Sequence, residues 1–103
     1  MVDEQVANGN NTTSKRAIIT VLGADKVGII AGVTTALARL GINIIDISQT
    51  TMRNIFTMIM LVELDKAAKP IQEIIDDLEN EGKKLNVEVR LQLEEIFKAM
   101  HRI

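Results

Sequence analysis

The sequence predicts one α+β domain in which the elements follow the order β-α-β-β-α-β, with an additional short helix at the C-terminus. Apolar runs of strand length alternate with stretches in which apolar residues recur every three or four positions. Glycine, proline and asparagine stand at the boundaries between these stretches. The first and third expected strands lack polar alternation, as the two central strands of such a sheet should. We therefore expect a ferredoxin-like sandwich, a four-stranded antiparallel sheet with helices on one face.

The N-terminal segment is polar and shows no periodic pattern. Asparagine, threonine, serine and glycine cluster between Asn8 and Ser14, which is typical of a chain that cannot bury a core. We expect a disordered polar leader over residues 1–15 and a single domain over residues 16–103. A docking tail is the functional alternative for the leader.

The first expected strand is Ala17–Gly23, a nearly continuous run of apolar and β-branched residues that is typical of a buried strand. A helix follows it, because apolar residues then recur at helical spacing: Ile29, Ile30, Val33, Leu37 and Leu40. Gly41 comes next, at the position where many helices end in left-handed backbone. We therefore expect the first helix to end at Gly41.

Two strands joined by a tight turn are expected in the middle of the chain. Ile42–Met52 has a mixed pattern, which favours an edge strand. Arg53 and Asn54 form the expected turn, since asparagine tolerates positive φ. Ile55–Leu64 has eight apolar residues in ten and no alternation, so it should be a central strand covered on both faces.

The second half of the chain predicts a helix, an edge strand and a short terminal helix. Pro70 suits the first turn of a helix, and apolar residues follow it at helical spacing: Ile71, Ile74, Ile75 and Leu78. Gly82 is expected to end that helix. Asn86–Leu91 then alternates as a half-exposed edge strand does. Gln92–Ile103 is expected to be a helix with one apolar stripe, made of Leu93, Ile96, Phe97 and Met100.

Both faces of the third expected strand are apolar, although two helices can cover only one face of the sheet. One face carries Phe56, Met58, Met60 and Val62, and the other carries Ile55, Ile59 and Leu61. Leaving several large apolar side chains in water forgoes about 1.5–3 kcal/mol each. We therefore expect a cover on the second face, either the C-terminal helix or a second copy in a homodimer that uses this face or an edge strand. Core packing explains Met58 and Met60 better than a metal site.

Composition excludes several classes of function. The net charge is −2 and the only aromatic residues are Phe56 and Phe97, so a nucleic-acid partner is not expected. The chain has no cysteine, which excludes disulfides and thiolate metal sites. No signal-peptide pattern or long apolar run is present, so we expect a cytoplasmic protein that does not interact with a membrane.

No arrangement of catalytic or cofactor-binding residues stands out in the sequence. The one histidine, His101, is third from the end, and neither Ser48 nor any threonine has a neighbouring base in the sequence. Gly23 and Gly28 enclose four residues as a P-loop begins, but Ile29 stands where a P-loop has lysine. The dinucleotide glycine pattern and EF-hand spacing are also absent. We expect a protein that is not an enzyme and has no catalytic residue, metal or cofactor.

The junction between the first strand and the first helix is the best candidate for a binding site. Gly23 permits a turn there, and the first helix amides lack intrahelical acceptors, so they attract an anion such as a carboxylate. Asp25 has two readings: it caps the helix by accepting from nearby amides, or it also holds the ammonium group of a ligand. Gly28 serves either close packing or the approach of a ligand. Asn43, early on an edge strand, can both donate and accept hydrogen bonds.

The stretch ITVLGADKVGIIAGVTTALARLGINIIDISQT resembles the front half of an ACT domain. The family pattern is Asp-x-Pro-Gly-Ile, then a helix, then Gly-x-Asn-Ile. Here these positions read Asp25-Lys26-Val27-Gly28-Ile29, with valine in place of proline, and Gly41-Ile42-Asn43-Ile44. The ending LEEIFKAMHRI is similar to that of a stand-alone, functionally uncharacterised ACT-domain family (UPF0237-like). The front half also resembles the regulatory domain of formyltetrahydrofolate deformylases and of glycine-cleavage regulators.

The resemblance implies a small-molecule-sensing regulatory module of amino-acid metabolism that works as a homodimer. It implies that an amino acid binds between the junction loop of one subunit and the early second strand of its neighbour. Carried over to this sequence, the ligand-binding residues are Asp25, Gly28, Ile29 and Asn43. The alternative is a ligand-free protein–protein interaction module that regulates a metabolic enzyme in trans, through a methionine-rich open face and the terminal helix.

Overall fold

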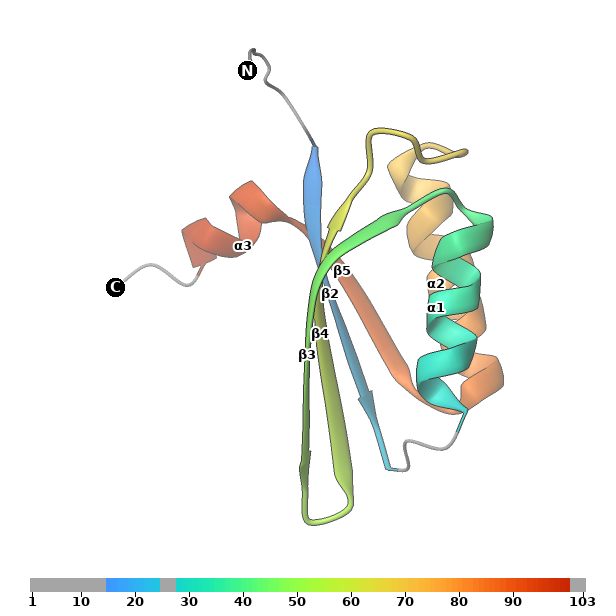
Figure 1. Ribbon diagram of the computed structural model, residues 1–103, viewed down its shortest axis with the longest axis vertical. Helices are drawn as coiled ribbons and strands as arrows, with labels where there is room; N and C mark the ends of the chain where they lie inside the picture. The colour runs from blue at the N-terminus through green and yellow to red at the C-terminus, as the bar shows by residue number, and fades with distance from the viewer. Residues whose placement is uncertain (1–14, 25–27, 101–103) are drawn as a thin grey trace.

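The structure is a computed structural model that describes residues 15–24 and 28–100. Its elements are β2 (Arg16–Gly23), α1 (Ile29–Arg39), β3 (Asn43–Met52), β4 (Ile55–Glu63), α2 (Ile71–Leu85), β5 (Glu88–Leu93) and α3 (Glu94–Met100). Figure 1 shows α1 and α2 on one side of a sheet whose strands follow the order β3-β4-β2-β5. Neighbouring strands are antiparallel. The predicted ferredoxin-like order, with the first and third predicted strands in the centre, is confirmed.

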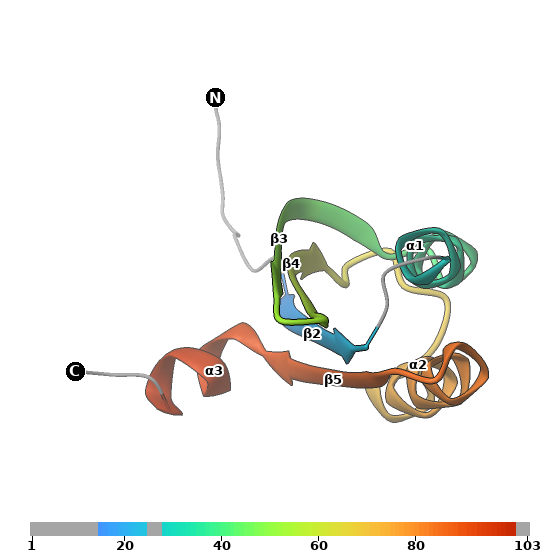
Figure 2. The same ribbon diagram turned by 90° about the horizontal axis from the view of Figure 1, so that it is seen from below.

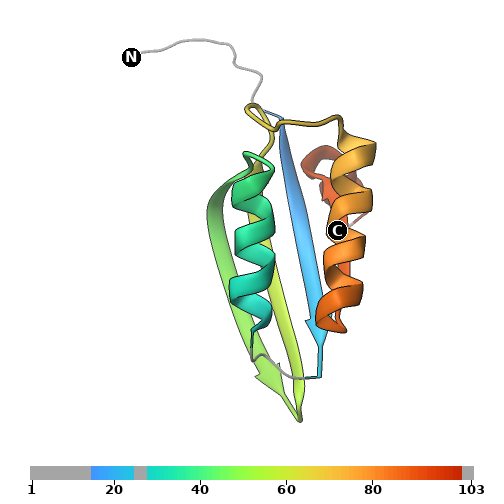
Figure 3. The same ribbon diagram turned by 90° about the vertical axis from the view of Figure 1, so that its right-hand side faces the viewer.

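The hydrophobic core lies between the sheet and the two long helices. Alternate residues of the central strands face the helices and are buried: Ala17, Ile19 and Val21 on β2, and Phe56, Met58, Met60 and Val62 on β4. Figure 3 shows α1 over the β3–β4 side of the sheet and α2 over the β2–β5 side. The core assignment of Met58 and Met60 is confirmed, but it contradicts the expected methionine-rich open face, because both side chains point to the helices.

Of the two helix ends predicted at glycines, the one at Gly41 is confirmed and the one at Gly82 is wrong. Gly41 follows α1 with a φ of 73°, so the left-handed helix end predicted there is confirmed. Gly82 was the wrong end for α2, which continues to Leu85 and ends at Asn86 with a φ of 59°. Gly82 lies inside the helix against β5, where a Cβ would lie 2.9 Å from the carbonyl oxygen of Val87. This glycine therefore allows close packing, and asparagine takes the left-handed position.

The β3–β4 hairpin contains the predicted tight turn and one irregularity. Arg53 and Asn54 have positive φ values of 48° and 71°, which confirms the turn. The pairing moves from Ile44 opposite Val62 to Asp46 opposite Leu61, so Ile45 is an extra residue in a β-bulge. The bulge reverses which residues of β3 face the helices, and this explains the mixed pattern of that strand.

The second face of the sheet is only partly covered. Figure 2 shows α3 on the side of the sheet away from α1 and α2, where it contacts β2 and β5. Arg16 anchors it by donating from Nε and Nη2 to the two carboxylate oxygens of Glu94, both at 2.9 Å. Ile55 and Ile59 remain 56% and 43% exposed. The terminal helix thus supplies part of the expected cover, and it begins at Glu94 instead of the predicted Gln92.

Candidate functional site

Two glycines shape the junction between β2 and α1, and the structure places the special backbone conformation at Gly28 and the close packing at Gly23, where the sequence suggested a turn at Gly23 and allowed close packing at Gly28. Gly28 is the N-cap of α1 and has a φ of 77°, while no heavy atom lies within 4 Å of the position where its Cβ would stand. Backbone conformation, and not crowding, therefore requires glycine at this position. At Gly23 a Cβ would lie 2.6 Å from Cγ1 of Val87, so close packing against the segment before β5 is the reason there.

The first turn of α1 keeps the features that attract an anion. The first intrahelical hydrogen bond runs from the amide of Gly32 to the carbonyl of Gly28 at 2.9 Å, which leaves the preceding amides without helical acceptors. Within the described residues no side chain caps the helix at Gly28, and its first turn has no acidic residue. Ile29 is only 2% exposed because its side chain belongs to the core. A ligand at this position could therefore contact only the backbone amide of Ile29, not its side chain. Asp25 lies outside the described residues.

Asn43 lies at the other end of α1. It is the exposed first residue of β3, and Gly28 is the N-cap of α1. Figure 1 shows that β3 and α1 begin at opposite ends of the sheet. The intervening helix has 11 residues, which at 1.5 Å per residue separates the two by about 16 Å. The junction and Asn43 therefore do not meet within a single chain, and their meeting across two subunits, which the resemblance implies, stays a prediction.

Asn43 lines a small polar hollow that the sequence did not reveal. The hollow measures about 330 Å³ and is lined by Gly41, Asn43, Glu63 and Lys66. Asn43 and Glu63 are direct cross-strand partners in the β3–β4 register, and Lys66 lies in the segment after β4. The only signal in the sequence was the appearance of charge where the apolar run of β4 ends. Placing Glu63 and Lys66 beside Asn43 required the strand register.

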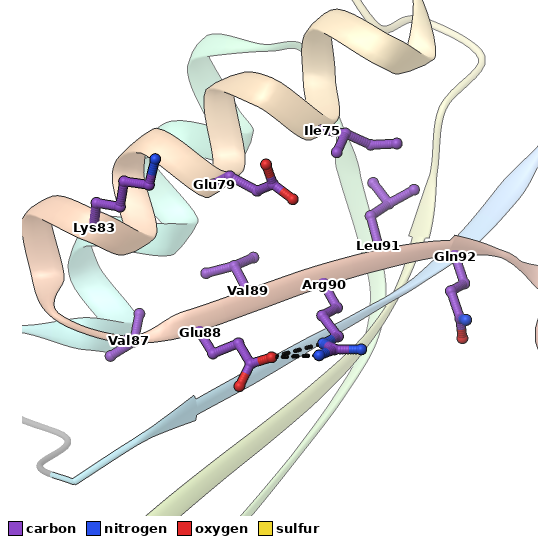
Figure 4. Close-up of a pocket in the computed structure, with 9 residues that line it drawn as sticks. All are labelled: Ile75, Glu79, Lys83, Val87, Glu88, Val89, Arg90, Leu91 and Gln92. Atoms are coloured by element: carbon purple, nitrogen blue, oxygen red, sulfur yellow. Dashed lines mark hydrogen bonds and ion pairs between the residues drawn. The ribbon is translucent and has the colours of Figure 1, made fainter.

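A second groove of about 440 Å³ lies at the opposite edge of the sheet, between α2 and the edge strand β5. Figure 4 shows Ile75 of α2 facing Leu91 of β5, with Val89 beside them. On the other side of the strand, Arg90 and Glu88 form an ion pair at 2.7 Å. This groove combines an apolar floor with an unpaired strand edge, and none of the predicted site residues lines it.

Two ion pairs line the groove between α1 and α2. Lys69 donates to Asp77 at 2.7 Å, and this hydrogen bond raises the pKa of Lys69 above its ordinary value. Arg39 lies 3.6 Å from Glu81. In the part of the chain that the structure describes, no group of three acidic or histidine side chains is placed to hold a metal ion. No described helix is long and apolar enough to cross a membrane.

Comparison with known proteins identifies the family to which the chain belongs. A model of the ACT domain matches residues 15–92. The chain is 52% identical over 91 residues to a UPF0237 protein of Methanosarcina acetivorans, which covers 88% of this chain and 99% of that protein. An ACT domain protein from Streptococcus pneumoniae superimposes with a TM-score of 0.75 at 43% identity, over 86% of this chain and 100% of that one. The chain therefore belongs to the ACT domain family, as the resemblance predicted.

Within that family, the sequence relatives are UPF0237 proteins. A formyltetrahydrofolate deformylase from Pseudomonas syringae has a TM-score of 0.72 at 16% identity, and the match covers 81% of this chain and 28% of that enzyme. At this identity the likeness shows a shared fold only. ACT domains are generally regulatory modules that bind small ligands.

Proposed function

We propose that this protein is a homodimeric regulatory module that binds a free amino acid between its two subunits. The observation that carries the proposal is the placement of Asn43, exposed in a polar hollow at the opposite end of α1 from the first helical turn, which no described side chain caps. One chain cannot use both groups for one small ligand. Two copies in opposite orientations can, because each then presents its Asn43 end to the first turn of α1 in the other.

The edge strand β3 offers a way to bring the two ends together. It is an outer strand of the sheet, and its residues from Ile45 to Met52 are exposed. Antiparallel pairing of two β3 edges about a two-fold axis sets the Asn43 end of one copy beside the hairpin end of the other. Helix α1, whose N-cap is Gly28, begins at that hairpin end (Figure 1).

The proposed site matches the two charged ends of an amino acid. The first amides of α1 receive the carboxylate, Asp25 receives the ammonium group, and the amide of Asn43 adds both a donor and an acceptor. Gly28 contributes space, because no atom lies within 4 Å of the position of its missing Cβ. Ile29 contributes its backbone amide.

A dye-based thermal-shift screen of the twenty common amino acids tests this function. At 100 times its dissociation constant, the correct amino acid should stabilise the fold by about 2.7 kcal/mol, which raises the melting temperature by about 10–20 °C in a domain of this size. Asn43→Ala should abolish the shift without changing the melting temperature of the free protein. Asp25→Ala should also abolish it, but it removes a candidate helix cap, so its free melting temperature must be compared. Unchanged melting curves with every amino acid would contradict the proposal.

A second candidate is a ligand-free module that binds a metabolic enzyme. The groove between α2 and β5 favours it, because an extended peptide can pair with an edge strand and place side chains on Ile75, Val89 and Leu91. Affinity capture from a native lysate separates the two candidates. If one enzyme is retained by the wild-type protein, is lost with Ile75→Glu, and no amino acid changes the melting curve, the second candidate is favoured.

A further inference from the structure

We propose that Glu63 and Lys66 add to the recognition of the bound amino acid from the Asn43 side, with Glu63 contacting the ammonium group and Lys66 the carboxylate in addition to the groups that the α1 junction of the other subunit supplies. This inference rests on the proposed function and identifies the groups on the Asn43 side of its site. Both residues line the same hollow as Asn43, and the hollow of about 330 Å³ is at the small end of the range for small-molecule sites. A small metabolite therefore fits it better than a peptide.

The sheet fixes Glu63 beside Asn43. The two residues stand directly opposite each other in the β3–β4 pairing, ahead of the bulge at Ile45. Direct cross-strand partners share a face, with Cβ atoms about 5 Å apart. A group that bonds to the amide of Asn43 is therefore within reach of the carboxylate of Glu63.

Backbone contacts fix the segment that carries Lys66. The amide of Ala68 donates to the carbonyl of Leu40 at 2.8 Å, and the amide of Ala67 donates to the carbonyl of Leu64 at 3.0 Å. Gly41 lies so close to this segment that a Cβ on it would be 2.7 Å from the carbonyl oxygen of Lys66. The segment that carries Lys66 is thus held against the end of α1. Gly41, which has no side chain, forms the floor of the hollow.

The charges that face this hollow are not neutralised within the described residues. Glu63 and Lys66 form an ion pair neither with each other nor with another described residue. Arg16 stands opposite Glu63 on β2, but both of its hydrogen bonds go to Glu94 at 2.9 Å. The guanidinium of Arg16 is therefore engaged by α3, and no ion pair joins it to Glu63 among the described residues. A ligand with one ammonium and one carboxylate group satisfies both open charges.

The predicted ligand class is a free α-amino acid. A carboxamide lacks the anion that Lys66 binds, and a carboxylic acid without the amino group lacks the cation that Glu63 binds. Hydrogen bonds to charged groups are strong enough that each change should weaken binding about 10- to 100-fold. This selectivity can be measured with the wild-type protein alone, so the test does not require any variant to fold correctly.

Isothermal titration calorimetry supplies the test. The probes are the amino acid with the largest thermal shift, its carboxamide, and the corresponding carboxylic acid without the amino group. We expect Glu63→Gln to bind the amino acid about 10- to 100-fold more weakly and to lose part of its preference over the deaminated acid. Lys66→Met should lose part of the preference over the carboxamide. Glu79→Gln and Lys83→Met make the same chemical changes in the α2–β5 groove and should bind as the wild type does.

The outcomes separate this inference from the proposed function. If Glu63→Gln and Lys66→Met retain wild-type affinity and selectivity while Asn43→Ala loses binding, the assignment of Glu63 and Lys66 is wrong and the proposed function stands. If the wild-type protein binds the carboxamide and the deaminated acid as tightly as the amino acid, the inference is also overturned. If no amino acid binds the wild-type protein, both fail. Circular dichroism of each variant confirms that it is folded.

Discussion

Phe56→Ala is expected to lower the free energy of unfolding by about 3–5 kcal/mol. Phe56 is 1% exposed and lies on the central strand β4, between β2 and β3. Its ring faces the side of the sheet that the long helices cover, along with Met58 and Met60. Removing it deletes a large buried surface and leaves a cavity, because rigid strands on both sides prevent the site from collapsing.

Urea denaturation monitored by circular dichroism measures this loss. Ile55→Ala is the control, because Ile55 is the preceding residue of the same strand but faces the open side and is 56% exposed. We expect Ile55→Ala to cost less than about 1 kcal/mol. Equal losses for the two variants would show that the assignment of the two faces of β4 is wrong.

Gly41→Ala is expected to have the next largest effect on stability, a loss of about 2–4 kcal/mol. Two costs combine at this position. The φ of 73° is left-handed, which costs an L-residue about 1–2 kcal/mol. The new Cβ would also lie 2.7 Å from the carbonyl oxygen of Lys66, so backbone must move. Because that backbone carries Lys66, the variant should also bind the ligand more weakly.

Gly28→Ala separates these two costs. Gly28 has nearly the same backbone conformation, with a φ of 77°, but no atom lies within 4 Å of the new Cβ. We expect it to lose only about 1–2 kcal/mol, measured in the same urea titrations. If the two alanine variants are equally destabilised, crowding between Gly41 and the Lys66 segment does not contribute.

The fold was largely predictable because its main signals are local. The signals are the predominantly apolar run of β4, the helical spacing before Gly41 and the turn at Arg53 and Asn54, and each depends on neighbouring residues only. Gly82 misled the prediction because a glycine inside a helix and a glycine that ends a helix look alike in sequence. Only the packing of α2 against β5 distinguishes them.

The candidate site was less predictable because its geometry depends on distant parts of the chain. The sequence pointed to Asn43 and the α1 junction, but the length and direction of α1 decide that they lie at opposite ends of the domain. Glu63 meets Asn43 only through the β3–β4 register, and the bulge at Ile45 that interrupts this register has no clear signal in the sequence. The role of Gly23 likewise depends on Val87, which is far away in the sequence.

The central claim is that each amino-acid site uses the α1 junction of one subunit and Asn43 of the other. Mixing Asp25→Ala and Asn43→Ala subunits tests it directly. Each variant alone has two defective sites per dimer, whereas each mixed dimer has one intact site and one with both defects. After the two variants are mixed in equal amounts and allowed to exchange subunits, calorimetry should recover about one quarter of the wild-type sites at wild-type affinity. Mixtures that bind no more amino acid than the separate variants, although subunit exchange is confirmed, would contradict the claim.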